Sequence, residues 1–465
     1  MKRILLFYAV LAIASCTNKD NIVEIQNLSA EFSDSTLRSI SEEMEPKLSI
    51  GEGLVCNHAE TVRLMRGGMT IAIIRLSEPV IVAQAVREEP WGYFQNPVLY
   101  RSENTNNLIV KWAMQEDSHL VYGNDSQGRL MSRDEGETWE ELDQDYFAMK
   151  RDCIVLSNGD VIQVKNPSTK DIKNYENFPN SVNEEPIGKQ KYKFYYESEL
   201  PSDFKGVYFQ YWNSKIGKES LMHASLNDPG LLRYAMDDMM PVVWWGNIKE
   251  LNDGSLLSGV YGGYYQNRKG EVLMSGIQFY KSKDGGYSWD IVGKIPFYKV
   301  GGDCEDLLFD GSDGYNEPTF EILSDNTYLC VMRNSSWSIP MHMSLSRDEG
   351  KTWSTPKPIT PNGVKPKLTL LGNGVLVLGS GRPGIQLRFN VDGDGDVWSE
   401  PIEMMSFVDE YGKYVSTRET CGYSSILAKD DNTFYFVYSD FTTRDNNGNL
   451  RKSILFRKVE VITRK

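Results

Sequence analysis

Pairs of short apolar runs separated by tight polar turns recur along the chain and predict β-hairpins. Six such pairs occur, each around a turn rich in Asn, Asp or Gly, at residues 98–112, 154–164, 248–260, 320–332, 368–378 and 426–438. Asn-Gly and Asp-Gly between β-rich runs are strong hairpin signals, because these residues tolerate the positive φ that tight turns require. The pattern therefore predicts an all-β protein of six antiparallel sheets, with short helical turns only near residues 39–44 and 227–239.

A second repeat, Ser-x-Asp-x-Gly-x-(Ser/Thr)-Trp, follows several of these hairpins. It begins at Ser132, Ser282 and Ser346, and a degenerate copy covers residues 392–398. The aspartate can accept hydrogen bonds from amides of its own turn, the glycine can take positive φ, and the tryptophan can pack on the next strand. A hairpin plus this turn makes a unit of about four strands, which matches a propeller blade. We therefore expect a six-bladed β-propeller with four antiparallel strands per blade and an enlarged second blade at residues 151–237.

The first residues predict export. Lys2 and Arg3 precede an apolar stretch, residues 4–14, that is too short to span a bilayer, and small residues lead to Cys16. This ending resembles the lipobox of bacterial lipoproteins, which implies that residues 1–15 are a signal peptide and that Cys16 is lipidated. An ordinary signal peptide that ends in cysteine is the alternative.

The same interpretation divides the chain. We expect residues 16–47 to tether the protein to the bacterial cell envelope, on the periplasmic or the surface face of the outer membrane. Residues 48–465 would form the propeller, and strands near residues 69–74 and 80–86 would close its ring or lean on it.

The acidic composition limits the partners. The net charge is −14, and neither nucleic acid nor an anionic lipid surface is a suitable main partner for a protein without a basic stripe. We therefore expect no nucleic-acid partner. An anionic substrate would need its positive partners concentrated in one place.

No cofactor or metal is expected. Apart from Cys16 the cysteines are odd in number and lack a Cys-x-x-Cys pair, which favours buried apolar residues over a disulfide framework or a zinc site, with room for one chance pair after export: Cys56, Cys153, Cys304, Cys330 and Cys421. The acidic residues of the degenerate turn resemble a calcium loop, but Val397 stands where that loop requires glycine.

These turns on a six-bladed propeller resemble the sialidase (BNR-repeat, Asp-box) superfamily over essentially the whole mature chain. The turns imply the fold more than the activity, because they lie on the outer rim of such propellers. Bacterial sialidases use a tyrosine nucleophile, a glutamate that activates it, an aspartic acid that donates a proton, and three arginines that bind the sugar carboxylate. A phenol paired with a base suits an anomeric carbon beside a carboxylate, and a guanidinium binds a carboxylate through two parallel hydrogen bonds.

Three segments are similar to those that carry the sialidase residues. Glu317 before a proline, followed by Arg333 at the end of the hairpin, is implied to be the base and a carboxylate ligand. Tyr423, at the start of the last hairpin, is implied to be the nucleophile. Arg382 follows its hairpin as Arg333 does, which makes it the second carboxylate ligand, and Arg418 is its competitor.

The first hairpin departs from the family pattern. Sialidases have Arg-Ile-Pro where this chain has Gln95-Asn96-Pro97, and Arg101 could substitute for the lost arginine only in a different strand register. The family's proton donor follows this hairpin, where Asp117 and His119 are both candidates, since histidine also acts as an acid near neutral pH. A substrate carboxylate would therefore lack one of the three guanidinium groups that sialidases supply.

The sequence therefore predicts an exo-glycosidase of sialidase type that releases terminal sialic acid, or a related acidic sugar, from extracellular glycans. A propeller hydrolase or lyase for another sugar, such as a uronic acid with His119 as acid or base, is one alternative. A non-catalytic glycan-binding surface lipoprotein is another. Nothing in the sequence predicts the oligomeric state.

Overall fold

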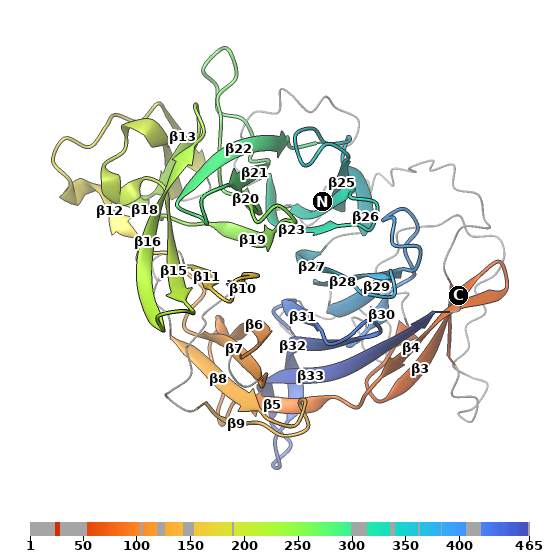
Figure 1. Cartoon of the computed structure of the whole chain (residues 1–465). Helices are drawn as coiled ribbons and strands as arrows, with labels where there is room; N and C mark the ends of the chain where they lie inside the picture. Colours follow the sequence, from red (N-terminus) through yellow and green to blue (C-terminus); the bar gives the residue numbers. More distant parts are fainter. Residues whose placement is uncertain are drawn as a thin grey trace, which may run out of the picture.

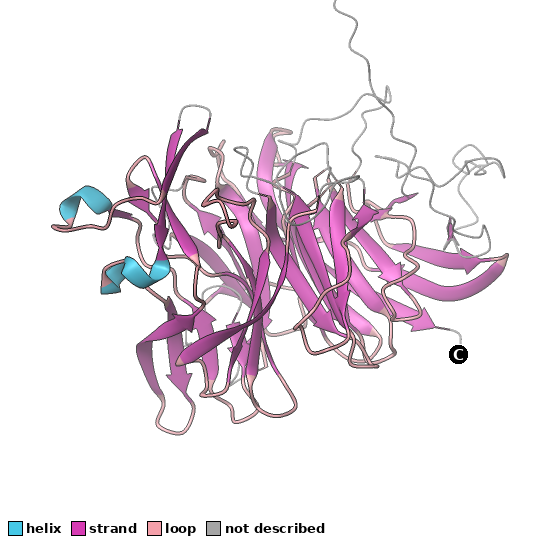
Figure 2. Cartoon of the chain, turned by 90° about the horizontal axis from the view of Figure 1, so that it is seen from above, coloured by secondary structure: helices cyan, strands magenta, loops and turns pink. Residues whose placement is uncertain are grey.

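The computed structural model describes residues 24–27, 54–102, 106–118, 126–142, 153–187, 190–298, 314–334, 340–360, 363–382, 384–405 and 420–463. Strands dominate this part of the chain, and its only helical pieces are the short 3-10 turns η3 (Ile172–Asn174), η4 (Glu197–Glu199) and η5 (Ser202–Phe204) (Figure 2). The all-β prediction is confirmed. No helix among these residues is long and apolar enough to cross a membrane.

Each of the six expected hairpins is present and begins a run of antiparallel strands. The hairpins are β6 (Tyr93–Arg101) with β7 (Leu108–Met114), β10 (Cys153–Val155) with β11 (Val161–Val164), β19 (Trp245–Glu250) with β20 (Leu256–Tyr261), β23 (Tyr315–Ile322) with β24 (Tyr328–Asn334), β27 (Val364–Leu370) with β28 (Leu376–Gly381), and β31 (Ser424–Ala428) with β32 (Thr433–Arg444). Their first strands lie around the middle of the molecule (Figure 1).

Further strands extend these hairpins outward. The additional strands are β8 (Gln127–Ser132) and β9 (Glu140–Glu141); β15 (Val207–Asn213) and β16 (Lys218–Asn227); β21 (Ile277–Ser282) and β22 (Ser288–Ile295); β25 (Met341–Ser346) and β26 (Lys357–Thr360); and β29 (Ile385–Asn390), β30 (Ile402–Glu403) and β2 (Leu54–Val55). Parallel pairing of β16 with β22 joins two of the expected blades into one eight-stranded sheet. The count of six separate blades stays a prediction.

The enlargement expected in the second unit is a separate five-stranded sheet. It is built from β12 (Lys170–Asp171), β18 (Met239–Met240), β17 (Leu232–Met236), β14 (Gln190–Tyr196) and β13 (Asn183–Ile187). The helical turn expected at residues 227–239 is wrong, because β17 pairs with β14 and then turns into β18. Asp237 and Asp238 both take positive φ, 50° and 67°, as a two-residue hairpin turn requires. The other expected helical turn, at residues 39–44, lies outside the described residues.

The two ends of the described chain share one sheet. The C-terminal strand β33 (Leu450–Thr463) pairs with β32, β4 (Met69–Leu76) and β5 (Val80–Gln84), so the expected strands near residues 69–74 and 80–86 are present and belong to the sheet of the last hairpin. Strand β3 (Glu60–Arg66) follows β4 in the sheet and pairs with β1 (Glu24–Asn27), which lies within the segment expected as a tether. Arg457 of β33 is fully buried and donates to the backbone carbonyls of Cys56, His58 and Ser77.

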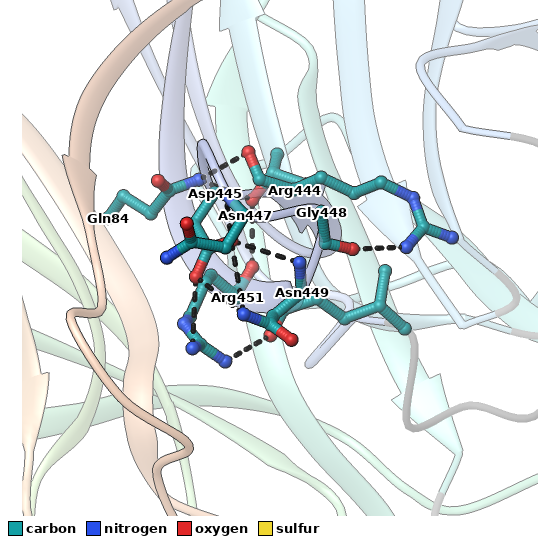
Figure 3. Close-up of polar contacts among 9 residues, drawn as sticks. Gln84, Arg444, Asp445, Asn447, Gly448, Asn449 and Arg451 are labelled. Carbon is teal, nitrogen blue, oxygen red and sulfur yellow. Dashed lines mark hydrogen bonds and ion pairs between the residues drawn. The ribbon is translucent and has the colours of Figure 1, made fainter.

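The tip of the β32–β33 hairpin is held by one carboxylate. Asp445 accepts hydrogen bonds from the amides of Asn447 and Asn449, both at 2.9 Å, and pairs with Arg451 at 2.9 Å (Figure 3). Gln84 reaches this hairpin from β5 and donates to the carbonyl of Arg444 at 3.4 Å. The side chains therefore reinforce the backbone pairing that joins N-terminal and C-terminal strands.

The core lies between neighbouring sheets. Leu329 and Val331 of β24, for example, share an apolar cluster with Leu376 and Leu378 of β28. Successive side chains of a strand point to opposite faces of the sheet. Because both faces are buried here, consecutive residues are apolar, which explains the long apolar runs of the hairpins. Cys56, Cys330 and Cys421 are buried in this interior and form no disulfide, and Cys153 is half-buried; Cys304 lies outside the described residues.

The three Ser-x-Asp turns share the hydrogen bonds that their sequence predicts. Asp134 accepts from the amide and the hydroxyl of Thr138, at 2.9 and 2.6 Å, and the indole of Trp139 donates to the carbonyl of Gly136 at 3.1 Å. The turns at Asp284 and Asp348 repeat this pattern. In the degenerate turn Asn390 replaces the serine and accepts from the amide of Gly395 at 3.0 Å.

Candidate active site

Three of the strands that lie around the middle of the molecule contain the same distortion. Asn96, Glu317 and Lys365 each precede a proline, and each has a positive φ, of 52°, 45° and 40°. The pairing register of β6, β23 and β27 shifts at these residues, so each forms a β-bulge. Positive φ is uncommon for residues other than glycine, and such strained positions cluster at functional sites. The bulges therefore mark the place in the fold where a site is expected.

The side chain of Glu317 is the centre of a hydrogen-bonded cluster. Tyr423, just before β31, donates its hydroxyl to Oε1 at 2.7 Å, while Arg333 of β24 donates from Nη1 to Oε2 at 3.0 Å. The amide of Lys365 also donates to Oε2, at 2.8 Å. Residues from three sheets thus meet at one carboxylate, including the expected base, nucleophile and first carboxylate ligand.

Burial and charge set the protonation states of this cluster. Burial by itself would raise the pKa of Glu317, but Arg333, the Tyr423 hydroxyl and Lys365 together hold it below its usual range. Burial and the neighbouring Glu317 carboxylate raise the pKa of Tyr423 well above its usual value, which Arg333 and Arg382 only partly oppose. Glu317 is therefore an anion and Tyr423 a neutral phenol at neutral pH, so the carboxylate is placed to accept the phenolic proton.

Two further cations lie beside the ring of Tyr423. The guanidinium carbon of Arg382 is 5.4 Å from the ring centroid, and the ammonium nitrogen of Lys365 is 5.0 Å from it. Arg382 also has positive φ, 50°, and donates from Nε to the carbonyl of Cys421 at 2.9 Å. Lys365 donates from Nζ to Oδ1 of Asn96 at 3.3 Å. The predicted second carboxylate ligand therefore lies in the cluster, together with a lysine that the sequence did not single out.

Asp117 is connected to this cluster through a tryptophan. The indole nitrogen of Trp91 donates to Oδ2 of Asp117 at 3.1 Å, and the Arg382 guanidinium lies 5.7 Å from the Trp91 ring centroid. Gly92 takes a φ of 102°, and a Cβ there would lie 2.4 Å from the Asp117 amide, so the loop passes very close to this residue. Asp117 is exposed, as a group that exchanges protons with substrate needs to be.

Two expected substrate ligands do not join the cluster. Gln95 is fully buried, and neither its amide oxygen nor its amide nitrogen has a partner among the described residues, so it has no exposed surface for a substrate. The bulge makes Asn96, not Gln95, the residue of β6 that reaches Lys365. Arg101 lies at the other end of β6, about 16 Å along the strand from Asn96, where it pairs with both carboxylate oxygens of Glu135 and contacts Tyr435. Its expected role in binding substrate therefore does not fit its position.

His119 and Arg418, the alternative acid and the alternative carboxylate ligand, lie outside the described residues, as does Cys16. Within the described part of the chain, no group of histidine, cysteine and acidic residues is arranged to hold a metal ion.

Three residues of the cluster were not predicted from the sequence: Asn96, Lys365 and Trp91. The first two could have been, because both precede a proline in the first strand of a hairpin, as Glu317 does. Trp91 carried none, since an isolated tryptophan before a strand is as common in a core as beside a site.

No protein-family model matches the sequence, and no curated protein matches it. The structure is similar to a protein of unknown function from Dyadobacter fermentans, with a TM-score of 0.58 at 14% identity over 83% of this chain and 99% of that chain. An α-L-arabinanase from Penicillium chrysogenum gives 0.47 at 12% identity over 82% and 98%, and a sialidase from Trypanosoma rangeli gives 0.41 at 13% over 80% and 56%. The first likeness shows a shared fold, and the two weaker ones bear on neither fold nor function.

Proposed function

We propose that this protein is a retaining exo-glycosidase that releases a terminal acidic sugar, sialic acid or a close relative, from glycans. The observation that carries the proposal is the 2.7 Å hydrogen bond from the Tyr423 hydroxyl to Glu317, with cationic side chains on both sides of the pair. Arg382 and Lys365 beside the Tyr423 ring supply the concentrated positive charge that an anionic substrate needs on a protein whose net charge is −14.

The arrangement fits a double displacement. Tyr423 would attack the anomeric carbon as its proton passes to Glu317, and the bond to the leaving oxygen would break as Asp117 gives that oxygen a proton. Water would then cleave the tyrosyl glycoside, losing a proton to Asp117, while Glu317 returns its proton to the phenolic oxygen. The sugar leaves with its original anomeric configuration, and all groups recover their starting states.

A neutral phenol suits a substrate whose anomeric carbon carries a carboxylate. A carboxylate nucleophile would be repelled by that group, whereas the phenol develops charge only as Glu317 takes its proton. Arg382 would neutralise the substrate carboxylate with a planar fork of donors. Gln95 offers no such group, so carboxylate recognition depends on the cations that surround Tyr423.

The test uses the full chain from Cys16 onward without lipid and a fluorogenic α-sialoside. We expect wild-type turnover with retention of configuration, seen by proton NMR, and a fluorinated sialosyl fluoride should label the peptide that contains Tyr423. Tyr423→Phe should abolish both, whereas Tyr287→Phe, at an exposed tyrosine remote from the site, should abolish neither. Absence of turnover on α-sialosides and on α- and β-uronides would refute the proposal.

We also propose that the protein is exported and anchored to the cell envelope through Cys16, where it meets extracellular glycans. The support is the sequence alone, a positive start, a short apolar stretch and small residues before a cysteine. Expression in a bacterial host with a labelled fatty acid should label the wild-type protein but not Cys16→Ala. A Cys16→Ala protein that still carries the label would overturn this part of the proposal.

A further inference from the structure

We propose that Lys365, together with Arg382, holds the acidic group of the substrate and so sets the specificity of the site. This inference rests on the proposed function, because it concerns the same site. It assigns to a lysine on β27 the recognition that β6, with its buried Gln95, does not supply.

The three cations of the cluster have different neighbours. Arg333 forms an ion pair with Glu317 at 3.0 Å, and both side chains are largely buried, at 16% and 14% exposure. Lys365 and Arg382 instead lie against the ring of Tyr423, at 5.0 and 5.4 Å from its centroid. A substrate whose anomeric carbon meets the Tyr423 hydroxyl therefore lies beside these two cations, while the guanidinium of Arg333 stays paired with Glu317.

The backbone around Lys365 fixes where its ammonium group lies. Its φ of 40° and the following Pro366 hold the bulge, and its amide is bound to Glu317 at 2.8 Å. At the other end of the side chain Nζ contacts Oδ1 of Asn96 at 3.3 Å. A long lysine side chain that is fixed at both ends loses less freedom on binding than a free one, as a residue that recognises a ligand requires.

A competing role has to be separated from this one. Lys365 also helps to hold the pKa of Glu317 below its usual range, so an alternative role of its ammonium group is to keep Glu317 ionised without contacting substrate. Substrate binding and ionisation of Glu317 have different effects on the kinetics. A contact made equally to substrate and transition state changes KM and leaves kcat, whereas a disturbed base changes kcat.

The experiment compares Lys365→Gln, Lys365→Arg and wild type, with Lys357→Gln as the matched control. Lys357 lies in an exposed ion pair with Asp396 on the outermost strand of its sheet. Lys365→Gln keeps the backbone amide that binds Glu317 and removes the ammonium group. For the α-sialoside we expect KM to rise roughly 10- to 100-fold with kcat within about threefold, since a charged hydrogen bond is lost. Lys365→Arg should recover much of the loss.

Calorimetric titration separates this inference from the proposed function, because it needs no turnover. The probes are N-acetylneuraminic acid, glucuronic acid, galacturonic acid and their methyl esters. Lys365→Gln should weaken binding of the preferred acid roughly 10- to 100-fold and leave its ester unchanged. Equal loss for acid and ester, a loss confined to kcat, or no binding of any acid by wild type would overturn the inference. Binding of an acid that depends on Lys365, without turnover, would refute only the proposed function.

Discussion

Replacement of Glu317 by Gln or Ala separates the catalytic role of this residue from its role in stability. Three donors converge on the carboxylate: the Tyr423 hydroxyl on Oε1, and the Arg333 guanidinium and the Lys365 amide on Oε2. In Glu317→Gln the amide oxygen can still accept from Arg333 and Lys365, while the amide nitrogen donates to the Tyr423 oxygen. Arg333 and Lys365 thus keep their acceptor, but the Tyr423 hydroxyl loses its own, and an amide cannot take the phenolic proton. Activity should therefore fall roughly 10²- to 10⁴-fold.

The stability cost should differ sharply between the two substitutions. Glu317→Gln loses a charge from a hydrogen-bonded pair and should cost about 1–2 kcal/mol, whereas Glu317→Ala leaves Arg333 buried without its carboxylate and should cost about 3–5 kcal/mol. With an unfolding entropy of roughly 0.8 kcal/mol/K for a domain of about 400 residues, these losses lower Tm by about 1–3 °C and 4–6 °C.

The assay is fluorogenic turnover together with differential scanning calorimetry on both variants. Equal destabilisation by Gln and Ala would show that the charge of Glu317, and not its satisfied hydrogen bonds, holds the cluster together. More than a tenth of wild-type activity in Glu317→Gln would show that Glu317 is not the base.

Three further predictions test other parts of the structure. Gly136→Ala should lower the free energy of unfolding in urea by roughly 2–5 kcal/mol, because φ is 95° there and a Cβ would lie 2.2 Å from the ring of Phe456. Gly285→Ala, at a φ of 74° with no atom near the new Cβ, should lower it by only about 1 kcal/mol. Burial lowers the pKa of His342 to about 4, so the unfolded state binds more protons between pH 6.5 and 4, and stability is lost as pH falls through this window. His342→Gln should remove up to about 3 kcal/mol of the pH dependence of the free energy of unfolding, measured by urea unfolding at pH 7 and pH 4. Trp91→Phe keeps a ring beside Arg382 but loses the bond to Asp117; kcat should fall about tenfold on a natural disaccharide and little on an aryl glycoside, whose leaving group needs no acid.

The strands were predictable because their signals are local. Each hairpin is predicted by the sequence of its own turn, and each Ser-x-Asp turn forms its hydrogen bonds within five residues, so neither depends on the rest of the fold. The segment at residues 227–239 could not be predicted in this way. Its extended conformation in β17 comes from pairing with β14, about forty residues earlier, which no local pattern reveals.

The candidate site was predictable only in part. Glu317, Arg333, Arg382 and Tyr423 carried motif signals, and the structure brings all four together. The link from Asp117 to this group runs through Trp91, which is 26 residues away in sequence, and depends on a loop whose course the sequence does not give. The burial of Gln95 and the contact of Asn96 with Lys365 were not predictable, because a bulge changes the register and turns adjacent side chains to other faces.

The three pre-proline bulges give a physical reason for the composition of the site. A regular strand would point alternate side chains into the contacts between sheets, where an amide, a carboxylate and an ammonium group would each need a buried partner. With positive φ at Asn96, Glu317 and Lys365 the three bulges instead contact one another: the Lys365 amide donates to the Glu317 carboxylate, and the Lys365 ammonium group donates to Asn96. Each strained residue costs on the order of 1–3 kcal/mol, which only a well-paired sheet on either side can offset. The same distortion, present in three sheets, thus places these polar groups together near the middle of the molecule.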